Sequence, residues 1–552
     1  MHVLKRIGRG MFEVWMNLQV ELHGSYSISR LRLLSKYSNS TSVFRASLFV
    51  AMAPFPTLII LTLIDCIPLA PTDEGYRANY LFWGRNYLTI SLMTRAILEQ
   101  LHLTVPSLNF TVMRTLSIST IPSAGAVAFM LAMASLIGFP LPFTLVVGIP
   151  VWYVGLVISF GIFFGAKLRD ERAVRKELLN YIVIIACQVV LTFIYPAYLY
   201  GFRSVSSTAQ TFYVLLLPIV KIATKNWISF FLGTNDDLKP QVVILNIEVF
   251  NALYVASSMQ NATSISTTMA LTLVDFLLAW ISIKDVNHFL SDITALLDKI
   301  PSDHPLKLAN FMEVALKMLE EDEELRADIA LRVFSVRSRP PNIGSKTPKI
   351  RAAEPTFEEV ETNVKSSNRI FPTAAIFAKS PQTSLVTVAA IAPAKPQTCK
   401  PLRKIFTAEQ RMEYVHRTAQ VLFTTEFIIL IEFTEVIIPF IYSTYTIAMF
   451  QLPNRVFYPQ IRVLDQMTLA KMIGNIAIYG LMELLSFIAM SVLLWKKLGI
   501  STLHQLAFVL DRERRMVQSN LFLWICYTIQ NSLDHNGADF SWQFAWLQDK
   551  TR

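Results

Sequence analysis

The sequence predicts an all-α integral membrane protein that crosses the bilayer about ten times. Of its 552 residues 53% are apolar and only 16% are charged, whereas soluble domains average about 25% charged residues. The apolar residues gather in runs of about 20, the length that a helix rising about 1.5 Å per residue needs to cross about 30 Å of hydrocarbon. These runs lack the polar face, repeating every 3.6 residues, that helices of a large soluble protein show.

Ten segments are predicted to span the membrane, eight of them clearly. The clear spans cover residues 46–69, 118–138, 143–166, 180–200, 241–259, 264–283, 420–447 and 468–495. A weaker span at 211–232 is interrupted by Lys221 and Lys225. The weakest, at 79–101, contains Arg85, Arg95 and Glu99.

The distribution of basic residues decides whether 79–101 crosses. Residues 1–45 and the short loop 167–179 are both rich in Lys and Arg, and such segments stay in the cytoplasm. Three clear spans separate them, an odd number that would place them on opposite sides. A fourth crossing at 79–101 removes the conflict, because its arginines are tolerable where they face other helices. The N-terminus, loop 284–419 and the C-terminus are then all predicted to be cytoplasmic.

The predicted spans divide the chain into a series of segments. The sequence indicates a basic N-terminal segment (1–45), a first bundle of about eight helices (46–283), a cytoplasmic helical segment (284–333), a disordered linker rich in Pro, Ser and Thr (334–404), a juxtamembrane helix (405–419), two further spans (420–495) and an amphipathic tail (496–552). Within the tail, residues 518–533 and the Trp542/Trp546 pair are expected to lie flat at the membrane surface, where amphipathic aromatic residues settle.

Ionisable residues inside the spans form the candidate functional site. A charge at the bilayer centre costs about 2.5–3.5 kcal/mol on insertion scales, so it usually faces the bundle. Counted from the cytoplasmic ends, Lys225, Glu248 and Asp275 share one depth, and Glu432 and Glu483 share another. Two polar layers within one bundle are therefore predicted. The full candidate set is Lys221, Lys225, Glu248, Asp275, Glu426, Glu432, Glu435 and Glu483.

Two interpretations of these charges stay open. In one, they line a cation or proton pathway, or the lysines bind an anionic substrate. In the other, they are buried ion pairs and hydrogen bonds that fix helix packing, a common use of polar residues in membranes.

The sequence gives little sign of an enzyme. It contains no Walker loop, no G-x-S-x-G and no H-E-x-x-H motif, and its four cysteines are scattered without metal-ligand spacing. No cofactor, no metal and no catalytic residue are predicted. The net charge of +10 fits the orientation of membrane loops better than it fits nucleic-acid binding.

Four stretches of the chain, found in residues 137–143, 246–255, 452–459 and 505–510, resemble the large family of uncharacterised multi-pass membrane proteins of oomycetes. The resemblance implies a multi-pass helical fold and assigns no residue a role.

Two functions from different classes remain. One is a secondary transporter or channel for a small solute or ion. The other is a membrane receptor or scaffold that binds cytoplasmic proteins through residues 284–419 and through its tail. In both cases the lipid bilayer is the first partner.

Overall fold

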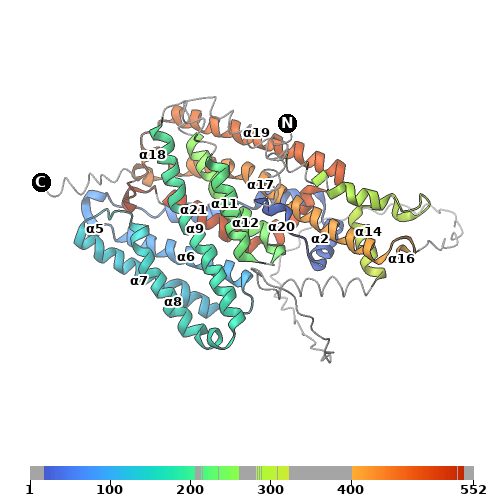
Figure 1. Ribbon diagram of the computed structural model, residues 1–552. Coiled ribbons are helices and arrows are strands. Elements are labelled where there is room, and N and C mark those ends of the chain that lie inside the picture. The colour runs from blue at the N-terminus through green and yellow to red at the C-terminus, as the bar shows by residue number, and fades with distance from the viewer. Residues whose placement is uncertain are drawn as a thin grey trace, which may run out of the picture.

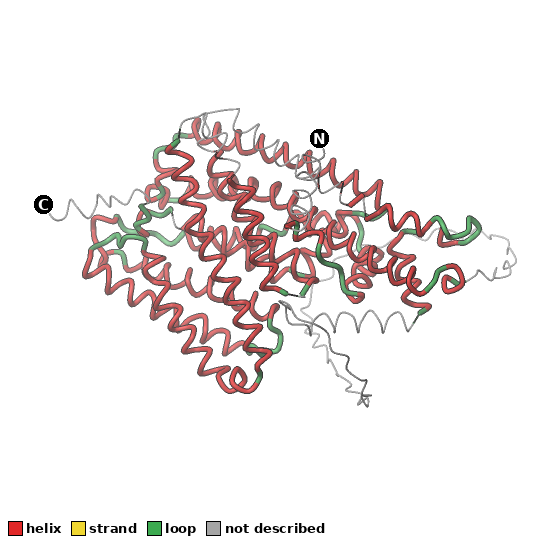
Figure 2. Tube along the Cα trace, in the orientation of Figure 1, coloured by secondary structure: helices red, strands yellow, loops and turns green. Residues whose placement is uncertain are grey.

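The computed structural model describes residues 18–205, 213, 216–233, 235–259, 281, 284, 286–287, 289–307, 309–322, 401–530 and 532–539. Within these ranges the chain is helical and contains no strand (Figure 2). The helices of the N-terminal half are α2 (Ile28–Ser40), α3 (Val43–Met52), α4 (Phe55–Asp65), α5 (Gly75–Ala78), α6 (Tyr80–Thr104), α7 (Val112–Ile137), α8 (Thr144–Asp170), α9 (Arg172–Ser204), α11 (Leu216–Leu232) and α12 (Lys239–Met259). Those of the C-terminal half are α14 (Phe311–Glu321), α16 (Leu402–Ile405), α17 (Ala408–Gln451), α18 (Pro459–Arg462), α19 (Gln466–Leu498), α20 (Thr502–Arg512) and α21 (Arg514–Gln530).

Helix α17 is the central element of the bundle. It begins at a capping box, in which Thr407 and Gln410 satisfy each other's backbone donors, and it continues for 44 residues. It packs against α12 on one side and α19 on another (Figure 1). Helices α7 and α8 form a pair at the edge of the bundle, and α6 joins that pair to α21.

Five helical segments are long and apolar enough to cross a membrane, counted over the described residues. They are Val43–Asp65, Val112–Ile137, Thr144–Asp170, Arg172–Ile194 and Gln466–Leu498. In the most apolar window of α8 only 11% of the residues are buried, and Val154, Ile158 and Ile162 lie exposed on its surface. Apolar faces of this extent on a folded chain indicate contact with hydrocarbon. The all-helical membrane class is thus supported, with five candidate spans.

The predicted spans mostly coincide with helices, although the total of ten crossings stays a prediction. Segments 79–101, 211–232, 241–259 and 420–447 correspond to α6, α11, α12 and the middle of α17, none of which is among the five candidates above. The segment at 46–69 is divided into α3 and α4 by Ala53 and Pro54. Segment 264–283 lies almost wholly outside the described residues.

The C-terminal tail departs from the prediction. Helix α21 does not lie flat at a surface: it packs between α6, α12 and α4, and Leu521, Ile525 and Cys526 are buried. The prediction for residues 518–533 is therefore wrong, because the polar residues of this helix face protein instead of solvent. Trp542 and Trp546 lie outside the described residues.

The described ends of the chain lie at opposite ends of the bundle. Near the start, the backbone N–H of Tyr26 donates to the carbonyl of Ala419 at 3.2 Å, next to the beginning of the predicted span in α17. Near the end, the N–H of Phe143 donates to Gly537 at 2.9 Å, and Arg462 pairs with Asp534 at 3.0 Å. In Figure 1, α5 and α18 mark this second end, and α14 and α16 mark the first. The two ends of the described chain thus contact different regions of the bundle.

The predicted disordered linker is covered only at its end. Residues 334–400 lie outside the described residues. Residues 401–404 are described and belong to the folded part, because Leu402 in α16 is buried. The predicted end of the linker at residue 404 is therefore too late.

Candidate functional site

Two predicted lysines and one predicted acid meet between α11 and α12. Lys221 Nζ lies 2.8 Å from Glu248 Oε2, and Lys225 Nζ lies 3.0 Å from Glu248 Oε1. The two lysines are one helical turn apart, so both reach the same carboxylate. The expectation that Lys225 lies beside an acid is confirmed. Asp275, the third predicted member of this layer, lies outside the described residues.

Glu426 is held by a second cluster, which joins α17 to the N-terminal segment. Arg30 Nη2 donates to both carboxylate oxygens, at 2.8 and 3.1 Å. The hydroxyl of Tyr26 and the amide of Gln241 donate to the same carboxylate. Gln505 Nε2 donates to Tyr26 at 3.1 Å. All five side chains are buried, so this carboxylate forms a hydrogen-bonded junction of α2, α12, α17 and α20.

The remaining predicted acids lie where α17 meets α19. Glu432, Glu435 and Glu483 are buried and each takes part in an interaction with its surroundings. The hydroxyl of Ser486 on α19 donates to Glu432 at 3.1 Å. Over the described residues, no three His, Cys, Asp or Glu side chains are grouped so that they could hold a metal ion.

A third cluster of charges was absent from the predicted site. Asp65, at the end of α4, pairs with Arg85 of α6, and both side chains are almost fully buried. Tyr458 donates to Asp65 Oδ1 at 2.9 Å and Gln530 donates to the same oxygen at 3.1 Å. Tyr445 donates to the other carboxylate oxygen. Asp65 lies at the end of its apolar run, where an acidic residue suggests the end of a membrane span. Only Arg85, which lies inside a predicted span, could be noticed in the sequence.

The three clusters have the same chemistry. Each places a carboxylate from one helix against cations, and in two of them also hydroxyls or amides, from other helices. An isolated buried charge is too costly to keep, so a buried ion is paired or hydrogen-bonded. The ionisable residues predicted from sequence are therefore divided among separate helix junctions.

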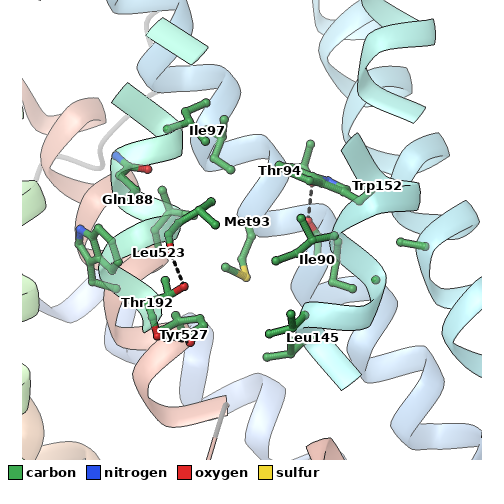
Figure 3. A pocket seen from close by; sticks show the side chains of 17 residues that line it. Ile90, Met93, Thr94, Ile97, Leu145, Trp152, Gln188, Thr192, Leu523 and Tyr527 are labelled. Atoms are coloured by element: carbon green, nitrogen blue, oxygen red, sulfur yellow. Dashed lines mark hydrogen bonds between the residues drawn. The ribbon is translucent and has the colours of Figure 1, made fainter. Parts of the chain in front are cut away.

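A cavity lies away from all of these clusters. It has a volume of about 150 Å³ and is lined by residues of α6, α7, α8, α9 and α21 (Figure 3). Its walls are mainly aliphatic and aromatic, with Met93, Trp152 and Leu523 among them, and no charged side chain lines it. This cavity could not be predicted from the sequence, because a gap between helices depends on how they cross.

Comparison with known proteins adds no relative. No protein-family model, no curated protein and no solved structure matches this chain.

Proposed function

We propose that this chain is a multi-pass membrane receptor or scaffold, and that its intramembrane charges hold the bundle together instead of conducting ions. The observation that carries the proposal is the pairing of those charges. Glu248 is shared by two lysines, Glu426 is bonded to Arg30, Tyr26 and Gln241, and no Asp, Glu, Lys, Arg or His lines the cavity.

The attachment of segment 323–400, which we propose to be cytoplasmic, supports the same proposal. The segment 323–400 leaves and rejoins the folded part at one place. There Asp322 Oδ2 accepts from Arg411 Nη2 at 2.5 Å, and Glu321 Oε2 accepts from the backbone N–H of Leu402 at 2.9 Å. A long segment anchored at both ends can engage a protein partner without disturbing the bundle, which suits a receptor or scaffold.

The topology that we propose keeps the ten predicted crossings and adds α21. The basic residues of 1–45 and 167–179 favour a cytoplasmic N-terminal segment. Residues 532–539 contact the loops at 66–79, 138–143 and 453–462, which are external in this topology. The C-terminal region would then be external as well. Helix α21 needs no long apolar run for such a crossing, because protein surrounds it.

Reporter tagging tests the topology. A tag after residue 552 is expected outside, with tags before residue 1 and at residue 110 in the cytoplasm. A cytoplasmic C-terminal tag together with a cytoplasmic N-terminal tag would contradict the crossing by α21 and restore the arrangement predicted from sequence. An external tag at residue 110 would contradict a crossing at 79–101.

Flux through the purified protein in liposomes tests the function. We expect proton and potassium flux no higher than in protein-free liposomes. The second candidate, a cation transporter, is favoured by the buried acids Glu432, Glu435 and Glu483 at one helix junction. Flux that is abolished by Glu432→Gln but unchanged by the matched surface variant Glu409→Gln would establish that candidate and overturn the proposal.

A further inference from the structure

The cavity between α6, α8, α9 and α21 is shaped for a small apolar molecule. A cavity of about 150 Å³ lined by aliphatic and aromatic side chains accepts a molecule the size of benzene and stays free of water. Ile90 and Met93 of α6, Leu145 and Trp152 of α8, and Leu523 of α21 form much of its wall (Figure 3). Ions and strongly polar solutes are excluded, because nothing in this wall replaces their hydration.

Most polar groups of the wall are already engaged with the protein. Thr94 Oγ1 donates to the carbonyl of Ile90 at 2.7 Å and accepts from Trp152 Nε1 at 2.8 Å. Thr192 Oγ1 donates to the carbonyl of Val189 at 2.6 Å, and the hydroxyl of Tyr527 donates to the carbonyl of Thr192 at 3.1 Å. These groups therefore have little left to offer a ligand.

Two residues of the wall are exceptions: Trp524, whose Nε1–H is buried without a hydrogen-bond partner among the described residues, and Gln188. Its side-chain Nε2 donates to Asn246 Oδ1 and, at 3.4 Å, to Gln100 Oε1, and these bonds fix which end of the amide is the oxygen. Among the described residues no group donates to Gln188 Oε1, although the residue is only 6% exposed. Figure 3 shows this oxygen on the cavity side of the amide. A carbonyl oxygen that faces an apolar cavity without a donor is costly, and a ligand that donates to it removes that cost.

We propose that this cavity is a binding site for a small, uncharged, mainly apolar molecule that carries one hydrogen-bond donor, and that Gln188 Oε1 accepts from that donor. A phenol or an indole belongs to this class. The inference goes beyond the receptor function proposed above and stands on the cavity alone.

The side of the cavity next to α8 and α9 is its route of entry. Val146 and Ile149 of α8 and Val189 of α9 line the cavity yet are only half-buried. Their neighbours Tyr153 and Val190 lie on the exposed apolar faces of two candidate membrane spans. A ligand of this class concentrates in hydrocarbon, so it reaches the site from the bilayer.

The test is a ¹⁹F-NMR titration of the full chain in lipid nanodiscs with two probes of the same size. 4-Fluorophenol carries a hydroxyl donor, and 4-fluorotoluene carries a methyl group in its place. We expect saturable binding above that of empty nanodiscs, with 4-fluorophenol preferred about three- to tenfold, the effect of one hydrogen bond. Gln188→Leu should abolish this preference while 4-fluorotoluene still binds.

A second variant locates the site. Leu145→Trp places bulk at the half-buried side of the cavity and should remove saturable binding of both probes. Leu136→Trp is the matched control, because Leu136 is exposed on the neighbouring α7 and does not line the cavity.

Binding that survives Leu145→Trp would overturn the site. Equal affinity for both probes in the unmodified protein would overturn the role of Gln188 and leave a plain hydrocarbon chain as the occupant. Uptake no greater than by empty nanodiscs would overturn the proposal as a whole.

Discussion

Asp65 and Arg85 form an ion pair that is almost completely closed to solvent, although the two residues belong to different helices. Asp65 is 0% exposed and Arg85 is 2% exposed. Tyr458 and Gln530 each contact both partners, because each donates to Asp65 and accepts from Arg85. The pair thereby connects α4 and α6 to the loop after α17 and to the end of α21.

Removing one partner of this pair is expected to destabilise the fold strongly. Arg85→Met leaves the Asp65 carboxylate without its cation, and breaking a buried pair in this way costs about 3–5 kcal/mol. Thermal unfolding in detergent should show a large fall in Tm. The double variant Asp65→Asn/Arg85→Met should recover part of the loss, because no charge is then left unpaired.

The same helix supplies a control. Arg95 and Glu99 form a more exposed pair on α6, with Nη2 and Oε1 2.6 Å apart. Arg95→Met should change stability by less than about 1 kcal/mol, as is usual for exposed pairs. Equal effects of Arg85→Met and Arg95→Met would contradict the view that burial makes the first pair important.

In the cluster at Glu248, replacing one lysine should reduce stability less than replacing the glutamate. Lys225→Met leaves the carboxylate with Lys221 at 2.8 Å, so the loss of stability should be modest. Glu248→Gln leaves two buried lysines without their shared acid and should cost more. Replacement of all three residues by apolar ones should restore much of the Tm. A Lys225→Met variant as unstable as Glu248→Gln would show that Lys221 does not compensate.

The positions of the buried charges were predictable from sequence, but most of their partners were not. Lys221, Lys225, Glu248 and Glu426 stand out because ionisable residues are rare in apolar runs. The lysines and Glu248 lie on neighbouring helices, and their matched depth indicated the contact between Lys225 and Glu248. Arg30 reaches Glu426 from a segment nearly 400 residues earlier, and nothing local in the sequence encodes that contact.

Helices that are enclosed by other helices were also hard to recognise as buried from the sequence. The five candidate membrane spans are recognisable in the sequence because their outer faces are apolar, as contact with lipid requires. Helix α21 carries Ser519, Asn520 and Gln530 at buried positions, so its composition resembles that of a surface helix. The cavity beside it depends on how α6, α8 and α9 diverge, and hydropathy says nothing about that geometry.

The connection at Asp322 should keep the protein intact after a cut in the segment 323–400. Arg411 donates to Asp322 through both Nη2 and Nε, and Tyr414 donates to the carbonyl of Phe311 at 3.1 Å. We expect both fragments to co-purify after limited proteolysis in that segment. Arg411→Ala should weaken their association more than Arg403→Ala, because the Arg403 side chain is half exposed. Fragments that separate freely in the unmodified protein would contradict this prediction.

His535 connects the C-terminal region to the loop that follows α4, and we expect this contact to be stabilising only when the imidazole is neutral. Its Nε2–H donates to the carbonyl of Ala70 at 2.8 Å, and its ring packs against Phe82, Phe139 and Phe457. Its Nδ1 is buried without a hydrogen-bond partner among the described residues. Burial therefore lowers the pKa of His535 to about 4, an effect to which the nearby Arg85 adds and which the bond to Ala70 opposes.

The sign of the pH effect follows from this lowered pKa. Above pH 6.5, the ordinary value, the ring is neutral in both the folded and unfolded chain, and its packing contributes fully. As the pH falls from about 6.5 toward 4, the unfolded chain binds a proton that the folded chain does not, so stability declines by about 3 kcal/mol. His535→Gln keeps an N–H donor but does not titrate. The Tm of the unmodified protein should therefore fall more steeply between pH 7 and pH 4.5 than that of His535→Gln, while parallel curves would show that His535 does not fasten this region.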